Sequence, residues 1–291
     1  MSRFPAPSAL TLHRPPALLV DAVLECAATG GRVRLLRGFA DDPLALLEAA
    51  AQAAAVLAGA AGHAAGAAPR PGALVAARAF TVVRGAISDE TLEIAIVWGA
   101  ALGALRQAEA TIHDAAGAVV MRGTLAVAEG VEIAAASSAS TGGGNTAPPA
   151  ELPLDRCGAG RPVLDFAPRR QAETAVLSWR AQAPGAAAAT LSFPSTLPLF
   201  AGHFPGRPLV PGVHLLAGVL VAVRCAAGGE WGLREVERAK WSGAVRPGDQ
   251  AEIAARWQDQ ADFLAVDATL SVGATLCMSC RMALRRLPVP P

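Results

Sequence analysis

The segment of residues 202–213 constrains this chain more than any other, because it surrounds one histidine with prolines and glycines. It reads GHFPGRPLVPGV. Proline fixes φ and glycine adopts backbone angles that other residues avoid, so the segment predicts a rigid loop. An apolar run follows and predicts a buried helix over 213–226. We therefore expect His203 to lie just before the start of a helix.

The start of that helix gives His203 useful chemical neighbours. The first N–H groups of a helix have no partners within the helix, and the positive end of the helix dipole lies there. A histidine can move a proton, and the N–H of Gly212 can stabilise a developing negative oxygen. The pattern predicts a site that does both.

The segment resembles the signature of the hotdog-fold 3-hydroxyacyl-[acyl carrier protein] dehydratases, G-H-F-P-G-x-P-x-x-P-G-V followed by a buried helix. Every fixed position matches. The resemblance implies His203 as the catalytic base and Gly212 as the amide donor. We expect substrate contacts from three neighbours, Phe204, Pro211 and Val213.

The second half of the chain departs from this family at one position. The family has a glutamate or an aspartate fourteen residues after the histidine, whereas this chain has Ala217 there. The second half thus has the base and lacks the acid.

A second apolar helix is predicted in the first half, over residues 43–58. Asp41 or Asp42 can cap it, Pro43 suits its first turn, and Gly59 is the expected stop. Its polar side chains, Glu48 and Gln52, lie one turn apart on one face. Burial would raise the pKa of such a carboxyl group, which suits a general acid. The alternative is a solvated glutamate on an exposed stripe.

Two short stretches of the first half also resemble the dehydratases. Residues 48–52, EAAAQ, are similar to the family's E-A-x-A-Q, and residues 13–21, HRPPALLVD, to its H-R-x-P-x-L-L-V-D. The resemblance implies Glu48 as the acid and His13 as a structural residue. Gln52 would orient Glu48 or close the pocket. No H-F-P-G loop precedes this helix, so the first half has the acid and lacks the base.

The two halves show the same order of elements. The expected strands are 13–27, 31–38, 73–84, 91–98, 104–113 and 118–128 in the first half, and 172–181, 187–193, 234–245, 250–258, 262–272 and 274–286 in the second. A Ser/Gly/Pro-rich stretch separates them. We predict an α+β double hotdog with an N-terminal domain at 1–133, a flexible linker at 134–168 and a C-terminal domain at 169–291. The first half is also similar to dehydratase-like proteins that pair with a second dehydratase in aryl-polyene pathways.

Composition and charge exclude several classes of protein. The net charge of +1 argues against a nucleic-acid binder. The most membrane-like stretches, 43–62 and 209–223, are interrupted by polar residues or proline and read as core helices. Cys277 and Cys280 form a lone C-x-x-C without a second pair, so we expect no metal site and no cofactor. No signal peptide is recognised, and a cytoplasmic location with reduced thiols is expected.

In hotdog dehydratases the histidine and the acid come from different protomers, at the dimer interface. Fusing two hotdogs would bring His203 of one half to Glu48 of the other, giving one complete site and a dead mirror site at Ala217. The resemblance then implies dehydration of 3-hydroxyacyl thioesters on an acyl carrier protein, in fatty-acid or aryl-polyene-type biosynthesis. Arg207, and Arg78 or Arg84, are candidates for the phosphate of the carrier's phosphopantetheine.

Other functions share this fold. A hotdog acyl-CoA hydratase or thioesterase is one alternative, and a non-catalytic acyl-binding protein is another. The double hotdog could be monomeric or could assemble further.

Overall fold

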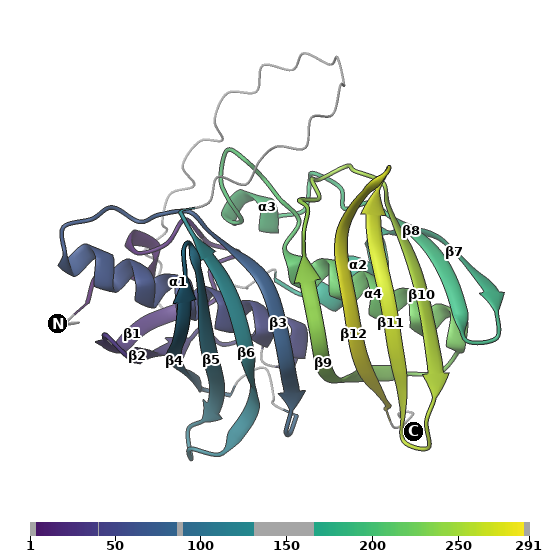
Figure 1. Ribbon diagram of the computed structural model, residues 1–291, viewed down its shortest axis with the longest axis horizontal. Coiled ribbons are helices and arrows are strands. Elements are labelled where there is room, and N and C mark those ends of the chain that lie inside the picture. The colour runs from purple at the N-terminus through teal and green to yellow at the C-terminus, as the bar shows by residue number, and fades with distance from the viewer. Residues whose placement is uncertain (1–3, 40, 86–89, 131–165, 288–291) are drawn as a thin grey trace, which may run out of the picture.

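The computed structural model describes residues 4–39, 41–85, 90–130 and 166–287 (Figure 1). The predicted linker, 134–168, lies almost wholly outside the described residues. The elements before it are called the first repeat and those after it the second repeat.

The first repeat contains a short 3-10 helix, one long helix and six strands: η1 (Pro7–Ala9), β1 (Val20–Ala27), β2 (Gly30–Leu35), α1 (Pro43–Ala64), β3 (Gly72–Val82), β4 (Leu92–Leu102), β5 (Leu105–Asp114) and β6 (Val119–Glu129). The second repeat follows the same plan with two added short helices: α2 (Pro168–Ala175), β7 (Val176–Ala183), β8 (Ala186–Leu191), α3 (Leu199–Gly202), α4 (Gly212–Ala227), β9 (Trp231–Trp241), β10 (Ala251–Asp259), β11 (Phe263–Val272) and β12 (Thr275–Arg286).

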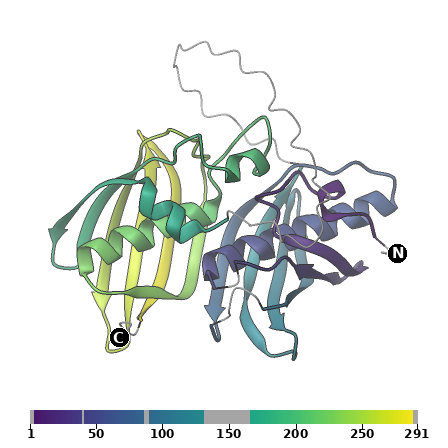
Figure 2. The same cartoon turned by 180° about the vertical axis from the view of Figure 1, so that it is seen from behind.

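The strands form one sheet, in the order β1-β2-β4-β5-β6-β3-β9-β12-β11-β10-β8-β7. The second half of this order mirrors the first, so that β9 corresponds to β3 and β7 to β1. The halves meet where β3 pairs antiparallel with β9, from Ala76 opposite Lys240 to Thr81 opposite Glu235. Figure 2 shows α1 and α4 lying along the same face of the sheet, one in each half. The chain is a double hotdog, as the sequence predicts.

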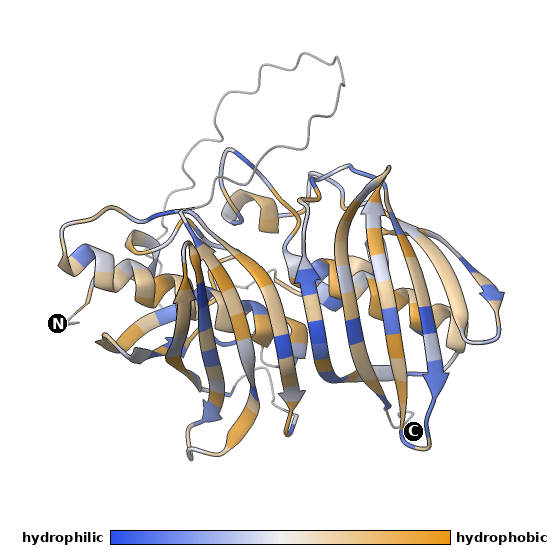
Figure 3. Cartoon of the chain, viewed as in Figure 1, coloured by the Kyte–Doolittle hydropathy of each residue, from blue (hydrophilic) through white to orange (hydrophobic). Residues whose placement is uncertain are grey.

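Alternating hydropathy along the strands explains how each half of the sheet wraps around its helix (Figure 3). In β10, Ala251, Ile253 and Ala255 are buried, and the residues between them are exposed. A period of two places one side of a strand against the core and the other in solvent. The helices fill the core: α1 is long and apolar enough to cross a membrane, but 72% of its most apolar window is buried inside the protein.

The helix α1 begins as predicted but ends later. Asp42 caps it, accepting a hydrogen bond from the N–H of Leu44 at 3.0 Å. It continues through Gly59 to Ala64, so the predicted stop at Gly59 is wrong, and His63 lies in its last turn. Gly59 serves close approach instead: a Cβ there would lie 1.9 Å from the carbonyl oxygen of Leu10.

One predicted strand of the second repeat is also wrong in part. Residues 172–181 were expected to be extended, but α2 occupies 168–175 and β7 begins at Val176. Pro168 suits the first turn of a helix. Gln171, Ala172 and Ala175 then form a buried face, one turn apart, that packs on α4. The first predicted strand, 13–27, is extended only from Val20, because residues 13–19 form a turn and irregular chain. The other predicted strands agree with the structure to within a few residues.

We expect Gly59→Ala to lower the free energy of unfolding by about 1–3 kcal/mol, because the added methyl group overpacks against Leu10. Gly62→Ala is the matched control, since the nearest atom to its Cβ would be 3.8 Å away. That variant should change stability by no more than about 1 kcal/mol, in the stabilising direction. Urea unfolding measures both, and equal stability of the two variants would contradict this account.

Candidate active site

The loop that carries His203 is attached to the first repeat. The N–H of Arg14, in the first repeat, donates to the carbonyl oxygen of Gly202 at 2.9 Å. Gly202 allows this approach, because a Cβ there would lie 2.0 Å from the carbonyl oxygen of Arg14. The N–H of His203 donates to the carbonyl oxygen of Leu199 at 2.8 Å. The loop therefore holds its histidine at the boundary between the repeats.

The imidazole of His203 is oriented to accept a proton. Its Nδ1 lies 2.8 Å from the carbonyl oxygen of Leu209. A carbonyl oxygen only accepts, so Nδ1 carries the hydrogen and Nε2 keeps a free lone pair. Burial lowers the pKa of His203 to about 4, and the bond to Leu209 opposes this shift. The ring is thus a neutral base near pH 7.

Glu48 lies on α1 and is 5% exposed. Burial raises the pKa of Glu48 to about 7, while a hydrogen bond from Nε2 of Gln52 to Oε1, at 3.1 Å, lowers it. A buried carboxyl group in such a setting keeps its proton up to near neutral pH and can donate it. His203 and Glu48 thus have the protonation states of a base and an acid at the same pH.

Gln52 connects Glu48 to the N-terminal segment. Its Oε1 accepts from the N–H of Leu19 at 2.8 Å, and its Nε2 donates to the carbonyl oxygen of Ala17 at 2.8 Å as well as to Glu48. The amide therefore satisfies two buried backbone groups and fixes the orientation of the carboxyl group.

His13 lies at the centre of the site, although the sequence suggests only a structural role. Its Nε2 is 3.7 Å from Oε1 of Glu48, and its ring centroid is 5.3 Å from that of His203 and 5.2 Å from that of Phe204. Its Nδ1 lies 3.0 Å from Oγ1 of Thr11. Burial, followed by the nearby His203 and Arg14, lowers the pKa of His13 to about 3, so its ring is also neutral.

These three residues form one buried cluster across the boundary of the repeats. One ligating atom each from His13, Glu48 and His203 lies within 4.8 Å of the others. Such a set could pass a proton or, by donor type and spacing, hold a divalent metal ion. Nothing in the sequence around His13 indicates this proximity, since it depends on how residues 13–19 pack along α1.

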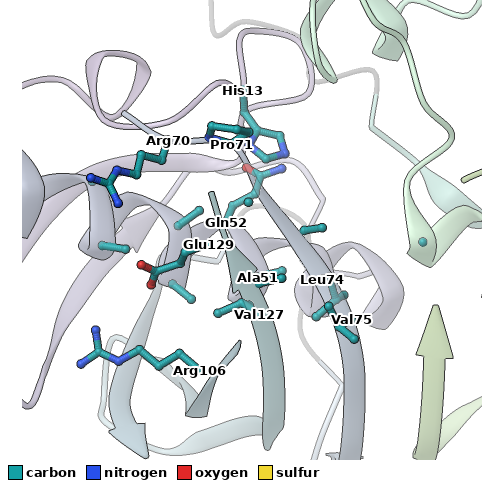
Figure 4. Close-up of a pocket in the computed structure, with 18 of the residues that line it drawn as sticks. His13, Ala51, Gln52, Arg70, Pro71, Leu74, Val75, Arg106, Val127 and Glu129 are labelled. Carbon is teal, nitrogen blue, oxygen red and sulfur yellow. The ribbon is translucent and has the colours of Figure 1, made fainter. Parts of the chain in front are cut away.

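The cluster lies in a cavity of about 770 Å³ (Figure 4). Gln52, Phe204 and Gly212, three of the residues singled out in the sequence, line this cavity. Gly212 is the first residue of α4, so its N–H has no partner within the helix. Its lack of a side chain makes room for Trp241, whose indole Nε1 would lie 2.5 Å from a Cβ and donates to the carbonyl oxygen of Gly212 at 3.1 Å.

Other predicted contacts are not part of the cavity wall. Pro211 is the N-cap of α4 and Val213 is buried in its first turn, and neither lines the cavity. Arg207 is exposed on the turn after Phe204. Arg84 forms ion pairs with Glu90 and Asp114. The cavity wall includes none of the three arginines proposed for the phosphate, Arg78, Arg84 and Arg207.

Comparison with known proteins agrees with this architecture. Residues 179–276 match the family model of the ApeI dehydratase, which spans β7 to the start of β12 and includes His203 and Gly212. This part of the second repeat is therefore similar to the ApeI dehydratase family. No curated protein matches the chain.

Solved structures match both repeats together. A tesB protein of Mycobacterium avium subs. paratuberculosis aligns over 94% of this chain and 97% of its own, with a TM-score of 0.54 and 12% identity. The dehydratase domain of RzxB from Pseudomonas fluorescens aligns over 94% of this chain and 99% of its own, with a TM-score of 0.53 and 13% identity. A Lactobacillus plantarum protein, provisionally described as an oleoyl thioesterase, aligns over 91% of this chain and 99% of its own, with a TM-score of 0.55 and 14% identity. At these identities the likeness shows the double-hotdog fold.

Among the residues that the structure describes, the mirror position in the second repeat has no comparable cluster. Ala217 is fully buried in α4. The small cavity on that side, about 100 Å³, is lined by Asp42, Leu44 and Leu220 among others, and by no histidine of the described residues. Asp42 is used as the cap of α1, and its second carboxylate oxygen accepts from the N–H of Arg169 at 3.2 Å.

We expect Gln52→Leu to destabilise the protein by about 1–3 kcal/mol for each of the two buried backbone groups that it leaves unpaired. It should also raise the pKa of Glu48 further, because the hydrogen bond from Gln52 favours the charged carboxylate. Chemical unfolding and an NMR titration of the glutamate carboxyl groups measure these effects. Gln107→Leu, at an exposed position of β5, is the control. An unchanged pKa of Glu48 would contradict the assigned contact.

Proposed function

We propose that this protein dehydrates 3-hydroxyacyl thioesters, carried by an acyl carrier protein, to trans-2-enoyl thioesters. The observation that carries the proposal is the pair of His203 and Glu48, from different repeats, in one buried cavity with opposite tendencies to hold a proton. Elimination of water next to a carbonyl group needs both a base and an acid. The ApeI-like second repeat supports the same reaction class.

In the proposed reaction, Nε2 of His203 removes the proton from the carbon beside the thioester carbonyl. The electron pair forms the new carbon–carbon double bond as the C3–oxygen bond breaks. Glu48 donates its proton to the departing hydroxyl group, which leaves as water. Return of the proton from His203 to Glu48 restores the starting state, and His13 lies against both groups.

Gly212 has a supporting role in this mechanism. Negative charge develops on the thioester oxygen while the proton is removed, and a backbone N–H at a helix start stabilises such an oxygen. The first N–H groups of α4 have this character, and Gly212 lines the cavity. A carrier protein fits the buried cluster because it would present the thioester on a long, narrow arm. Arg207, exposed on the histidine loop, remains a candidate for the phosphate of that arm.

We expect His203→Ala and Glu48→Gln each to lower kcat/KM on a 3-hydroxyacyl carrier thioester by roughly 10²–10⁴-fold, because each removes one proton-transfer group. The assay follows enoyl formation by absorbance and thiol release in parallel. His63→Ala is the control, since His63 is exposed and lies outside the cavity.

Three results would contradict the proposal. Equal activity of all variants would remove His203 and Glu48 from the reaction. Thiol release without enoyl formation would identify a thioesterase instead. Loss of turnover after chelation, restored by a divalent metal, would replace acid–base chemistry at the cluster by metal chemistry.

The pH dependence of kcat/KM should be bell-shaped. His203 must be neutral to accept a proton, so activity is lost as the pH falls through its pKa of about 4. Glu48 must be protonated to donate, so activity is lost as the pH rises through its pKa of about 7. The maximum should lie between these values. A rate that keeps rising above pH 7 would show that protonated Glu48 is not the acid.

A further inference from the structure

Two imidazoles beside Glu48 each have one ring nitrogen next to an oxygen and one nitrogen left over. In His203, Nδ1 donates to the carbonyl oxygen of Leu209 at 2.8 Å, so Nε2 keeps its lone pair. In His13, Nδ1 lies 3.0 Å from Oγ1 of Thr11, which can accept in the same way. A histidine that binds a metal ion almost always donates its other ring N–H to an oxygen or to water. Both rings thus have the arrangement of metal ligands.

The spacing of the three side chains suits a zinc ion. One ligating atom each from His13, Glu48 and His203 lies within 4.8 Å of the others. Zinc is usually bound in a tetrahedron with bonds of about 2.0–2.2 Å, which places its ligand atoms about 3.4 Å apart. Nε2 of His13 and Oε1 of Glu48, at 3.7 Å, are already close to this spacing. Side-chain rotations that shorten the longest separation by about 1.4 Å would complete the tetrahedron.

The types of ligand favour zinc among the common divalent cations. Two imidazoles and one carboxylate, with a fourth position left open, form the ligand set of several catalytic zinc sites. Calcium and magnesium prefer oxygen ligands throughout. The cluster lines the cavity of about 770 Å³, so the open position would face that space. None of the described cysteines, Cys26, Cys225, Cys277 and Cys280, belongs to the cavity wall.

The charges around the cluster permit a cation. The rings of His13 and His203 are neutral, because burial lowers their pKa values to about 3 and about 4, so neither ring has to lose a proton. Glu48, whose pKa burial raises to about 7, supplies one negative charge when its proton leaves. Arg14 opposes a cation near His13, but it is exposed and its guanidinium donates to two carbonyl oxygens. Solvent therefore screens its repulsion.

We propose that His13, Glu48 and His203 together bind one zinc ion, and that this ion reversibly inhibits the enzyme. The binding follows from the cluster itself, whereas the inhibition rests on the proposed function. In that function His203 needs its lone pair and Glu48 needs its proton. A bound zinc ion takes the lone pair and displaces the proton, so it lowers the activity. A catalytic metal centre would show the reverse effect.

Zinc binding is measured on the full chain after chelation, by titration against a metal-binding dye. The wild type should bind one zinc ion at the cluster. His13→Ala and His203→Ala should each weaken binding by at least roughly 10–100-fold, the cost of losing only an outer partner of a ligand. Thr11→Val keeps the shape of the side chain and removes the oxygen beside His13, so it should weaken binding by roughly 10–100-fold even if an alanine variant fails to fold. His63→Ala and Cys225→Ser are the matched controls, since both side chains are exposed and lie outside the cavity.

Two further measurements test the ligands and the effect on activity. Cobalt bound in place of zinc should give the strong visible absorption of a tetrahedral site, without bands from thiolate ligands, and His203→Ala should abolish it. With substrate below KM and free zinc at ten times its Kd, turnover of a 3-hydroxyacyl carrier thioester should fall about 11-fold, and a chelator should restore it. The zinc concentration that halves the activity should equal the Kd from the titration.

Zinc binding that is absent, or equal in the wild type and in the cluster variants, would overturn the site. Zinc that binds at the cluster of an active enzyme without lowering its turnover would overturn the inhibition. If bound zinc instead raised turnover, the proposed acid–base reaction would also fail, while the site would stand. If zinc binds at the cluster but the protein shows no dehydratase activity, the proposed function fails and the metal site stands.

Discussion

The pairing of β3 with β9 is the interaction on which the site depends. It joins two half-sheets into one and sets the two core helices against each other. The hydrogen bond from Arg14 to Gly202 then attaches the histidine loop of one repeat to the N-terminal segment of the other. Because Glu48 and His203 come from separate repeats, neither repeat could form the cluster alone. The geometry of the candidate site therefore depends on the stability of the boundary between the repeats.

Burial shifts the pKa values of the histidines and of Glu48 in opposite directions. Removal from water disfavours the charged form of any group, so it keeps the imidazoles of His13 and His203 neutral and keeps the carboxyl group of Glu48 protonated. A single apolar environment thus favours a neutral imidazole and a protonated carboxyl group side by side. The hydrogen bond from Gln52 opposes the shift of Glu48, which keeps the pKa of that carboxyl group near neutrality.

Local sequence predicted much of this arrangement, because motif, helix patterning and strand alternation are local properties. The histidine loop, the helix with its acid, and the doubled order of strands could all be read in this way. The place of His13 could not, since it follows from the path of residues 13–19 over α1. The same holds for Gly59, which looks like a helix stop but allows Leu10 to approach the helix backbone. In α2, three small or polar residues gain a buried face only because α4 is beside them.

The mirror side of the molecule shows what covalent fusion permits. In a dimer of identical subunits, two-fold symmetry repeats every substitution in both sites. Here, counted from the first residue of each helix, Ala217 of α4 stands at the position of Glu48 in α1, and Leu220 stands at the position of Ala51. One side of the boundary between the repeats holds a cavity of about 770 Å³, while the mirror side holds one of only about 100 Å³. Because the two repeats are joined in one chain, each can carry residues that the other lacks, and the two sides of their boundary can differ.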